Sequence, residues 1–304
     1  MKITALAGGV GGAKLLVGLA ALDDVELTAI VNTADDARIY GVHVSPDVDI
    51  CTYWLAGIAD EERGWGIAGD TFHVVDALRA LGEDTWFSLG DRDFATCIHR
   101  TDRLDRGVPL HRVTRDIAVS LGVTASVLPM SDDEVRTRIV TPDGRTLDFQ
   151  EYFVKERQEP EVAEVLFAGI AAATPAPGVL TAIAEADRVV VCPSNPVVSI
   201  GPILALAGVR DALRAHRDVA AVSPIVRGRA LKGPADRMLA SVGARVSAAG
   251  VASLYADFVT RFVIDETDAG EAPPVEELGL AVQTVDTIMT DRRASRRLAR
   301  ALAA

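Results

Sequence analysis

Four aspartates gather in two short motifs near the start of this chain of 304 residues. Asp35 and Asp36 end the sequence NTADD, and Asp47 and Asp49 belong to the sequence SPDVD ten residues further on. Four carboxylates this close repel one another unless a cation lies among them, and hard oxygen ligands are those that Mg²⁺ prefers. The pattern therefore predicts a magnesium site. The ordinary alternative is that Asp47 or Asp49 caps a helix and the other two lie in a solvated turn.

A glycine-rich segment precedes these aspartates. The sequence AGGVGGAK occupies residues 7–14, directly after an apolar run and before a helical pattern. Glycines at such a junction let the backbone approach a phosphate, and the following helix N-terminus favours an anion. The segment is neither a Walker A motif nor a complete G-x-G-x-x-G dinucleotide fingerprint. We interpret it as a phosphate-binding loop, against the alternative of a tight strand-to-helix turn. A side chain at Gly11 is then expected to weaken donor binding and to leave the protein folded.

Two further polar motifs follow predicted strands. In LGDRD at 89–93, Arg92 could pair with a phosphate or a planar acceptor; the alternative is an Asp-capped helix with a surface arginine. In CPSNP at 192–196, Ser194 and Asn195 can both donate and accept hydrogen bonds, as a nucleotide requires; the alternative is a proline-rich turn. The five histidines show no metal-ligand spacing, and His43 is the one closest to the aspartates.

These motifs need a sheet to bring them together. Near-continuous apolar runs are typical of strands buried on both faces, and they occur at 2–7, 26–32, 85–89, 125–128, 188–192, 220–226 and 261–264. Helical patterns lie between them at 14–22, 71–81, 160–173 and 200–214, and another covers 292–304. This alternation predicts an α/β protein with a Rossmann-like, mostly parallel sheet and helices on both faces. Ligands of such sheets bind at the carboxyl ends of the strands.

One segment breaks the alternation. Residues 136–140 and 145–149 flank Pro142-Asp143-Gly144, which predicts an antiparallel β-hairpin. We expect a single domain over residues 1–304, with a smaller inserted α+β hairpin and helical region at about 130–180. Met130-Ser131-Asp132-Asp133, at the start of this region, is by itself a loop.

Composition excludes several classes of protein. Net charge is −12 and only 5% of residues are aromatic, which argues against nucleic-acid binding and against anionic membrane surfaces. No apolar run is long enough to span a membrane. Three scattered cysteines fit a reducing compartment, so a cytoplasmic location is expected.

Taken together, ten ordered motifs resemble the 2-phospho-L-lactate transferase family of coenzyme F-420 biosynthesis, which includes the actinobacterial phosphoenolpyruvyl transferases. They are AGGVGGAKLL, NTADD, SPDVD, WGIAGDTF, LGDRD, LPMSDD, CPSNPVVSIGPI, AVSPIV, LKGPADRM and DTIM. They span essentially the whole chain. Ile50 departs from the residue often found after the second aspartate of SPDVD, without touching the carboxylates.

The resemblance implies a Mg²⁺-dependent transferase, commonly a homodimer. It would move a phospholactyl or phosphoenolpyruvyl group from a guanosine diphosphate-linked donor to the deazaflavin Fo (7,8-didemethyl-8-hydroxy-5-deazariboflavin) and release GMP. The implied metal ligands are Asp35, Asp36, Asp47 and Asp49, and the implied catalytic residues are Asp36, Asp49 and Arg92. Donor and acceptor are assigned to Gly8, Gly9, Gly11, Gly12, Lys14, Asn32, Ser131, Asp132, Asp133, Ser194, Asn195 and Pro196.

Two rival functions remain. A non-catalytic nucleotide-sugar-binding regulator of related fold would share the glycine loop and the Asn-Asp motif, but it should lack the set formed by SPDVD, MSDD and LGDRD. An NAD-dependent oxidoreductase would need the dinucleotide fingerprint that the glycine segment lacks. If the chain is such a transferase, Asp49→Asn is expected to lower kcat by about 100-fold or more and to keep a near-native melting temperature.

Overall fold

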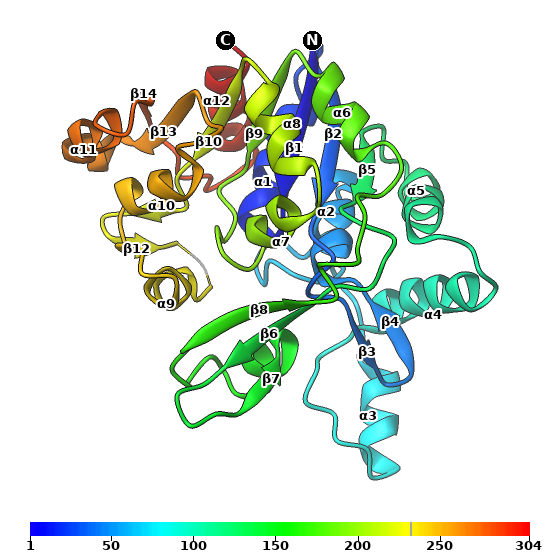
Figure 1. Ribbon diagram of the computed structural model, residues 1–304. Helices are drawn as coiled ribbons and strands as arrows, with labels where there is room; N and C mark the ends of the chain where they lie inside the picture. Colours follow the sequence, from blue (N-terminus) through cyan, green and yellow to red (C-terminus); the bar gives the residue numbers. More distant parts are fainter. Residues whose placement is uncertain (232) are drawn as a thin grey trace.

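A seven-stranded parallel sheet forms the centre of the computed structural model, which describes residues 1–231 and 233–304 (Figure 1). Its strand order is β14-β13-β10-β9-β1-β2-β5. The strands are β1 (Lys2–Ala7), β2 (Glu26–Val31), β5 (Ser126–Pro129), β9 (Arg188–Val191), β10 (Val219–Val222), β13 (Arg261–Asp265) and β14 (Ala281–Val285). Every neighbouring pair is parallel, so all seven carboxyl ends meet at one edge. The α/β class with a mostly parallel sheet is thereby confirmed.

Helices cover both faces of this sheet. Ile3, Ala5 and Ala7 of β1 face a core shared with α1 (Gly9–Ala20), α2 (Pro46–Ala56), α5 (Leu110–Ser120) and α12 (Arg292–Ala303). Leu6 faces the opposite core, which is shared with α6 (Val179–Glu185), α7 (Ile200–Ala205), α8 (Val209–Ala215) and α10 (Ala248–Tyr255). Successive residues of a strand point to opposite faces, so a strand between two helix layers must be apolar throughout. The apolar runs of the sequence have this origin.

Smaller elements extend from the carboxyl edge of the sheet. A hairpin of β3 (Ala37–Ile39) and β4 (Val42–Val44) packs with α3 (His73–Ala80) and α4 (Asp91–Asp105) around a separate small core. A second, three-stranded sheet has the order β7-β6-β8, from β7 (Thr146–Asp148), β6 (Arg136–Val140) and β8 (Glu164–Ala168). In Figure 1 both project below the central sheet. The hairpin predicted around Pro142-Asp143-Gly144 is confirmed by the antiparallel pairing of β6 with β7.

The remaining elements complete the chain. They are the π-helix η1 (Glu151–Lys155), β11 (Ile225–Val226), β12 (Arg229–Ala230), α9 (Ala235–Ser241), the 3₁₀ helix η2 (Glu266–Glu271) and α11 (Ala272–Glu276). Lys232 of the LKGPADRM motif lies outside the described residues. Within the described ranges, no helix combines the length and the apolar character needed to cross a membrane.

Three sequence predictions of local structure are wrong. Residues 85–89 form no strand; Trp86, Phe87 and Leu89 instead pack into the small core beside α3 and α4. Residues 160–173 form no helix, because the segment EVLFA pairs with β6 as β8. The helix expected over 200–214 is two helices, since Gly208 at the start of α8 has a φ of 82°, which a continuous helix does not allow.

Candidate active site

The direction of the strand order reverses beside β1, and the glycine loop lies at that point. From β1 the chain proceeds outward through β2 and β5, and it then returns to place β9 on the other side of β1. The loop after β1 therefore faces the turn after β9. Gly8 N donates to Ser194 Oγ at 3.1 Å, and Ser194 Oγ donates to Gly8 O at 2.7 Å. Such a reversal point is where open α/β sheets bind nucleotides and other ligands.

Close packing inside the protein accounts for three of the glycines. A Cβ at Gly11 would lie 2.3 Å from the carbonyl oxygen of Pro193, and one at Gly12 would lie 2.7 Å from Ser194 Oγ. A Cβ at Gly8 would lie 2.4 Å from a carboxylate oxygen of Asp47. A side chain at Gly11 would thus push two turns apart, so the expectation that the Gly11→Val variant stays normally folded is withdrawn. Phosphate binding by this loop stays a prediction.

Lys14 reaches the other end of the chain. Its Nζ donates to Met289 O at 2.8 Å and lies 5.8 Å from the ring centroid of Trp54. Asn195 stabilises its own turn, because its Oδ1 accepts from the N–H groups of Val197 and Val198. Donor binding by Lys14, Asn195 and the adjacent Pro196 stays a prediction.

Asp47 joins the glycine loop to the end of β2. One of its oxygens accepts from Gly9 N at 2.8 Å, and the other accepts from Asn32 Nδ2 at 3.0 Å. Asn32 Oδ1 in turn accepts from Ala34 N at 3.0 Å, which shapes the NTADD turn. Burial raises the pKa of Asp47 to about 6, although these two hydrogen bonds oppose the rise. Both carboxylate oxygens of Asp47 are thus already engaged by the protein.

Asp36 is held on one side only. Its Oδ2 accepts from Ser45 Oγ at 2.7 Å and lies 2.8 Å from His43 Nε2, whereas its buried Oδ1 has no hydrogen-bond partner. His43 comes from β4 and Ser45 immediately precedes α2, so these two elements fix the carboxylate. The histidine nearest to the aspartates in sequence therefore does touch the cluster.

Asp35 is buried beside Asp36 and also has an oxygen without a partner. Its side-chain Oδ1 has no hydrogen-bond partner. Burial raises the pKa of Asp35 well above its ordinary value, and the nearby carboxylate of Asp47 raises it further. A buried polar atom without a partner is costly and calls for an explanation such as a bound ion. The free oxygens of Asp35 and Asp36 fit the hard-oxygen ligands of Mg²⁺, whereas the engaged oxygens of Asp47 fit less well.

Asp49 has a different environment, although it lies on the same helix as Asp47. Both of its oxygens accept from the guanidinium of Arg100 on α4, one of them at 3.0 Å. Both side chains are buried, and Arg100 also donates to His43 O at 3.2 Å. Burial raises the pKa of Asp49, and the positive charge of Arg100 opposes the rise. This geometry favours a role for Asp49 in positioning α4 and β4 over direct metal ligation, which stays a prediction.

Arg92 lies in the first turn of α4, eight residues before Arg100 on the same helix. The neighbouring Asp93 accepts from Tyr53 Oη at 2.8 Å, and burial together with Asp49 raises the pKa of Asp93 to about 7. The main chain of Arg92 donates to Asp70, and its guanidinium donates to Ala68 O at 3.3 Å. Arg92 is exposed, so its side chain is accessible to an acceptor molecule.

The MSDD segment serves the fold around the site. Ser131 Oγ donates to Thr174 O at 2.6 Å, and the carboxylate of Asp133 accepts from the N–H and hydroxyl of the same threonine. Asp132 accepts from His111 N at 2.7 Å, at the start of α5. None of these contacts reaches Asp35 or Asp36, and an acceptor-side role for the segment stays a prediction.

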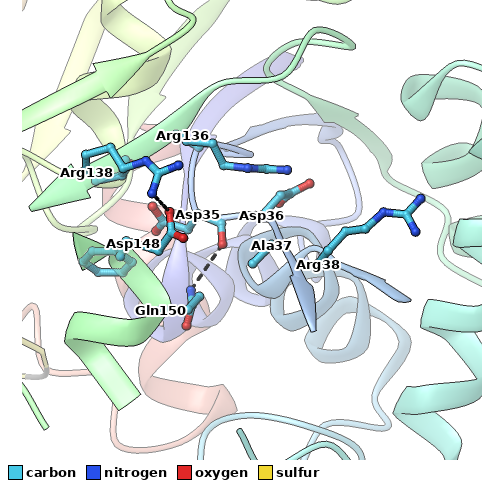
Figure 2. A pocket seen from close by; sticks show the side chains of 11 residues that line it. Asp35, Asp36, Ala37, Arg38, Arg136, Arg138, Asp148 and Gln150 are labelled. Atoms are coloured by element: carbon cyan, nitrogen blue, oxygen red, sulfur yellow. Dashed lines mark hydrogen bonds and ion pairs between the residues drawn. The ribbon is translucent and has the colours of Figure 1, made fainter. Parts of the chain in front are cut away.

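The structure adds residues that the sequence did not reveal. A cavity of 90 Å³ lies between the NTADD turn and the small sheet, lined by Asp35, Asp36, Arg38, Arg136, Arg138, Asp148 and Gln150 among others (Figure 2). Thr137 N donates to Ala34 O at 2.7 Å, and Gln150 Nε2 donates to Asp35 O at 3.4 Å, which ties β6 and the segment between β7 and η1 to the turn. No spacing in the sequence links positions 35 and 136. The sequence signal for this wall of the cavity was the pair of arginines at 136 and 138, because residues two apart in a strand lie on the same face.

The fold and this arrangement define a class. It is a doubly wound α/β protein with a glycine loop at the strand-order reversal, where proteins of this class bind their ligands, and with free carboxylate oxygens and arginines facing each other across a cavity. The model of the family 2-phospho-L-lactate transferase CofD matches residues 3–298, and the chain belongs to this family of transferases.

Similar proteins support this membership. A phosphoenolpyruvate transferase of Streptomyces griseus is 45% identical and aligns over 99% of this chain and 96% of its own length. A 2-phospho-L-lactate transferase of Methanothermobacter thermautotrophicus is 46% identical over 94% of this chain and 92% of its own length. A third relative, the 2-phospho-L-lactate transferase of Methanosarcina mazei, is 40% identical, and the match covers 96% of both chains.

A crystal structure of a UPF0052 family member from Bacillus halodurans has the same fold. The TM-score is 0.68 over 100% of this chain and 98% of that chain, at 15% sequence identity. At that identity the likeness concerns the fold alone. The family match and the curated relatives make this chain a transferase rather than a non-catalytic regulator or an oxidoreductase.

Proposed function

We propose that this transferase moves a phospholactyl or phosphoenolpyruvyl group from a guanosine diphosphate-linked donor to the deazaflavin Fo, releases GMP, and so acts in coenzyme F-420 biosynthesis. Relatives named for each of the two transfers support it from outside the molecule. From within, the observation that carries it is the pair of buried, unpartnered oxygens on Asp35 and Asp36, with arginines on the opposite wall of the same cavity.

The donor's diphosphate is assigned to the reversal point of the sheet. Gly8 to Gly12 open α1 there, and a helix N-terminus favours phosphate because its first N–H groups lack partners within the helix. The N–H groups of Gly8 and Gly9 already donate to Ser194 and Asp47, so the phosphate is assigned to the N–H groups that follow them. Ser194 lies against Gly8, so we assign the CPSNP turn to the same phosphates. Mg²⁺ held by Asp35 and Asp36 would supply positive charge, which would offset the negative charge of the donor phosphates.

The transfer is a displacement at phosphorus. The ribityl hydroxyl of Fo attacks the phosphorus that bears the acid, a new P–O bond forms, and the P–O bond to GMP breaks. Asp36, with its Oδ2 fixed by Ser45 and His43, is assigned to accept the hydroxyl proton as part of the Asp36–His43 pair. Asp49 and Arg100 fix the position of His43 through its carbonyl oxygen. Arg92, exposed at the start of α4, is assigned to the acceptor side.

The test is a direct assay with both donors. The purified chain is incubated with Fo and with the guanosine diphosphate-linked donor of lactate or of enolpyruvate, and GMP and the coupled product are measured by mass spectrometry. We expect Fo-dependent GMP release from at least one donor, and a loss of turnover when EDTA removes Mg²⁺. Absence of GMP release from both donors, with Fo and Mg²⁺ saturating, would refute the proposal. We also expect the protein to be a homodimer and to be located in the cytoplasm. Sedimentation of the active protein tests the dimer.

A further inference from the structure

The cavity in Figure 2 has one wall that the transfer reaction does not yet use. Arg136 and Arg138 lie two residues apart on β6, so their side chains leave the same face of that strand. The facing wall is the NTADD turn with Asp35 and Asp36. At 90 Å³ the cavity is small beside pockets of roughly 300 Å³ or more that enclose whole drug-sized ligands. It suits one small group of a larger ligand.

The two arginines differ in how their charge is already used. Arg138 forms an ion pair with Asp148 on the neighbouring strand β7. Arg136 is largely buried, at 18% exposure, and its ion pair within the described ranges runs from Nε to Glu134, whose side chain is 73% exposed. So exposed a partner contributes little. In the described part of the chain no hydrogen bond occupies the two terminal nitrogens of Arg136.

Figure 2 shows where this guanidinium points. Arg136 reaches over Asp36 across the cavity, whereas Arg138 turns toward Asp148 and Arg38 points away from Asp35. Arg38 is also engaged elsewhere, since it donates to Asp105 at 2.9 Å and to Gly41 O at 3.2 Å. Arg136 is thus the cavity arginine whose planar pair of terminal donors remains available for a ligand. That pair matches a carboxylate in bidentate geometry.

The donor carries one anionic group besides its phosphates. Lactate and enolpyruvate both place a carboxylate on the carbon that bears the phosphate ester oxygen. We propose that Arg136 binds this carboxylate and that the cavity between β6 and the NTADD turn is the subsite for the three-carbon acid. The inference rests on the proposed function and adds the residue that recognises the acid. It also places the reacting phosphorus, which is adjacent to the acid, beside Asp35 and Asp36.

The test compares binding of two ligands that differ only in the carboxylate. The first is the guanosine diphosphate-linked donor of lactate, and the second is its ethyl counterpart, in which a hydrogen replaces the carboxylate. Dissociation constants are measured by calorimetry without Fo, so no turnover is needed. A charge-assisted, bidentate contact predicts that the wild-type protein binds the lactyl ligand about 10- to 100-fold more tightly than the ethyl ligand. In the Arg136→Met variant we expect this ratio to fall close to one, with the affinity for the ethyl ligand unchanged.

Arg38→Met is the matched control, because it removes another arginine of the same cavity lining whose guanidinium is engaged elsewhere. It should leave the ratio at the wild-type value. If Arg136→Met does not fold, Arg136→Lys keeps the charge without the planar fork, and an intermediate ratio is expected. Equal loss of both ligands in Arg136→Met would overturn the inference, because it would show that Arg136 binds phosphate or only supports the fold. A wild-type ratio near one would also overturn it when it is found both for the lactyl pair and for the corresponding enolpyruvyl and vinyl pair.

The two proposals can fail separately. If the wild-type protein prefers the lactyl ligand through Arg136 but transfers nothing to Fo, the subsite stands and the proposed reaction is wrong. If transfer to Fo occurs and the wild-type ratio is near one for the lactyl pair, the measurement is repeated with the enolpyruvyl ligand and its vinyl counterpart. A ratio near one in that pair too leaves the reaction standing and rejects the subsite.

Discussion

Asp35 and Asp265 are both buried aspartates at the carboxyl edge of the central sheet, yet the protein treats them in opposite ways. Asp265 ends β13, and each of its oxygens accepts from the N–H and the hydroxyl of one threonine, Thr267 or Thr287. Burial alone would raise the pKa of Asp265, but these hydrogen bonds outweigh it and lower the pKa. Asp35 has a free oxygen and a strongly raised pKa. A carboxylate that the fold satisfies is structural, and one that it leaves unsatisfied is available to a ligand.

Asp49 lies between these two cases. Its oxygens have partners, as those of Asp265 do, but the partner is the charged guanidinium of Arg100 rather than neutral N–H and hydroxyl groups. Asp49→Asn should produce the largest change, since it leaves the buried guanidinium of Arg100 without a counter-charge. Removing one partner of a buried ion pair costs about 3–5 kcal/mol of unfolding free energy. Thermal and denaturant unfolding measure this loss of stability. The sequence alone predicted a near-native melting temperature for Asp49→Asn, and the structure predicts a lower one.

A double variant separates charge from size at that pair. Asp49→Leu combined with Arg100→Met removes both charges and should recover most of the stability lost in Asp49→Asn, while activity remains low. A near-native melting temperature for Asp49→Asn alone would show that the pair contributes little, and Asp49 would then be free for the metal.

Asp35→Asn should lower activity without lowering stability. The amide keeps the size of the side chain and removes a charge that burial and Asp47 disfavour. We expect kcat/KM to fall by about 100-fold or more, the usual scale for a charge-stabilising group. The melting temperature should stay the same or rise. Near-wild-type turnover at saturating Mg²⁺ would place the metal elsewhere in the cluster.

Asp265→Asn should show the reverse. The amide replaces one carboxylate oxygen with an NH₂ group, which cannot accept the hydrogen bonds that one of the threonines donates. The loss of these bonds costs about 1–3 kcal/mol of unfolding free energy. Unfolding in urea should reveal that loss, and kcat per folded molecule should match the wild type. A variant with native stability but impaired transfer would contradict the distinction between the two aspartates.

The smallest effect concerns pH. The pKa of Asp265 is lower in the folded protein than the ordinary value of 3.8, so its ionised form stabilises the fold above about pH 3.8. That contribution is lost as the pH falls through the folded-state pKa. The stability difference between wild type and Asp265→Asn should therefore be constant near neutral pH and shrink below about pH 3.8. Urea unfolding at a series of pH values measures it, and a difference that persists unchanged into acid would contradict the lowered pKa.

Local patterns in the sequence were sufficient for much of the scaffold. Continuous apolar runs predicted the buried parallel strands, because a strand covered on both faces has no polar side. Asp143-Gly144 predicted the hairpin, because these residues act through their own backbone conformation. The same patterns placed Asp35, Asp36 and the glycine loop at one edge of the sheet. The family resemblance was readable for the same reason, as it depends on ordered motifs alone.

Only the tertiary structure decided which of these groups are free. Aspartates look alike in sequence, but their partners in the fold come from distant elements: Arg100 for the candidate Asp49, and Thr287 for Asp265. β8 likewise pairs with β6, and the local sequence of residues 160–173 does not reveal that pairing. Arg136 meets Asp36 across a cavity only because β6 docks on the NTADD turn. Hydrogen bonding and burial are properties of the folded chain, and they determine which polar side chains remain available for chemistry.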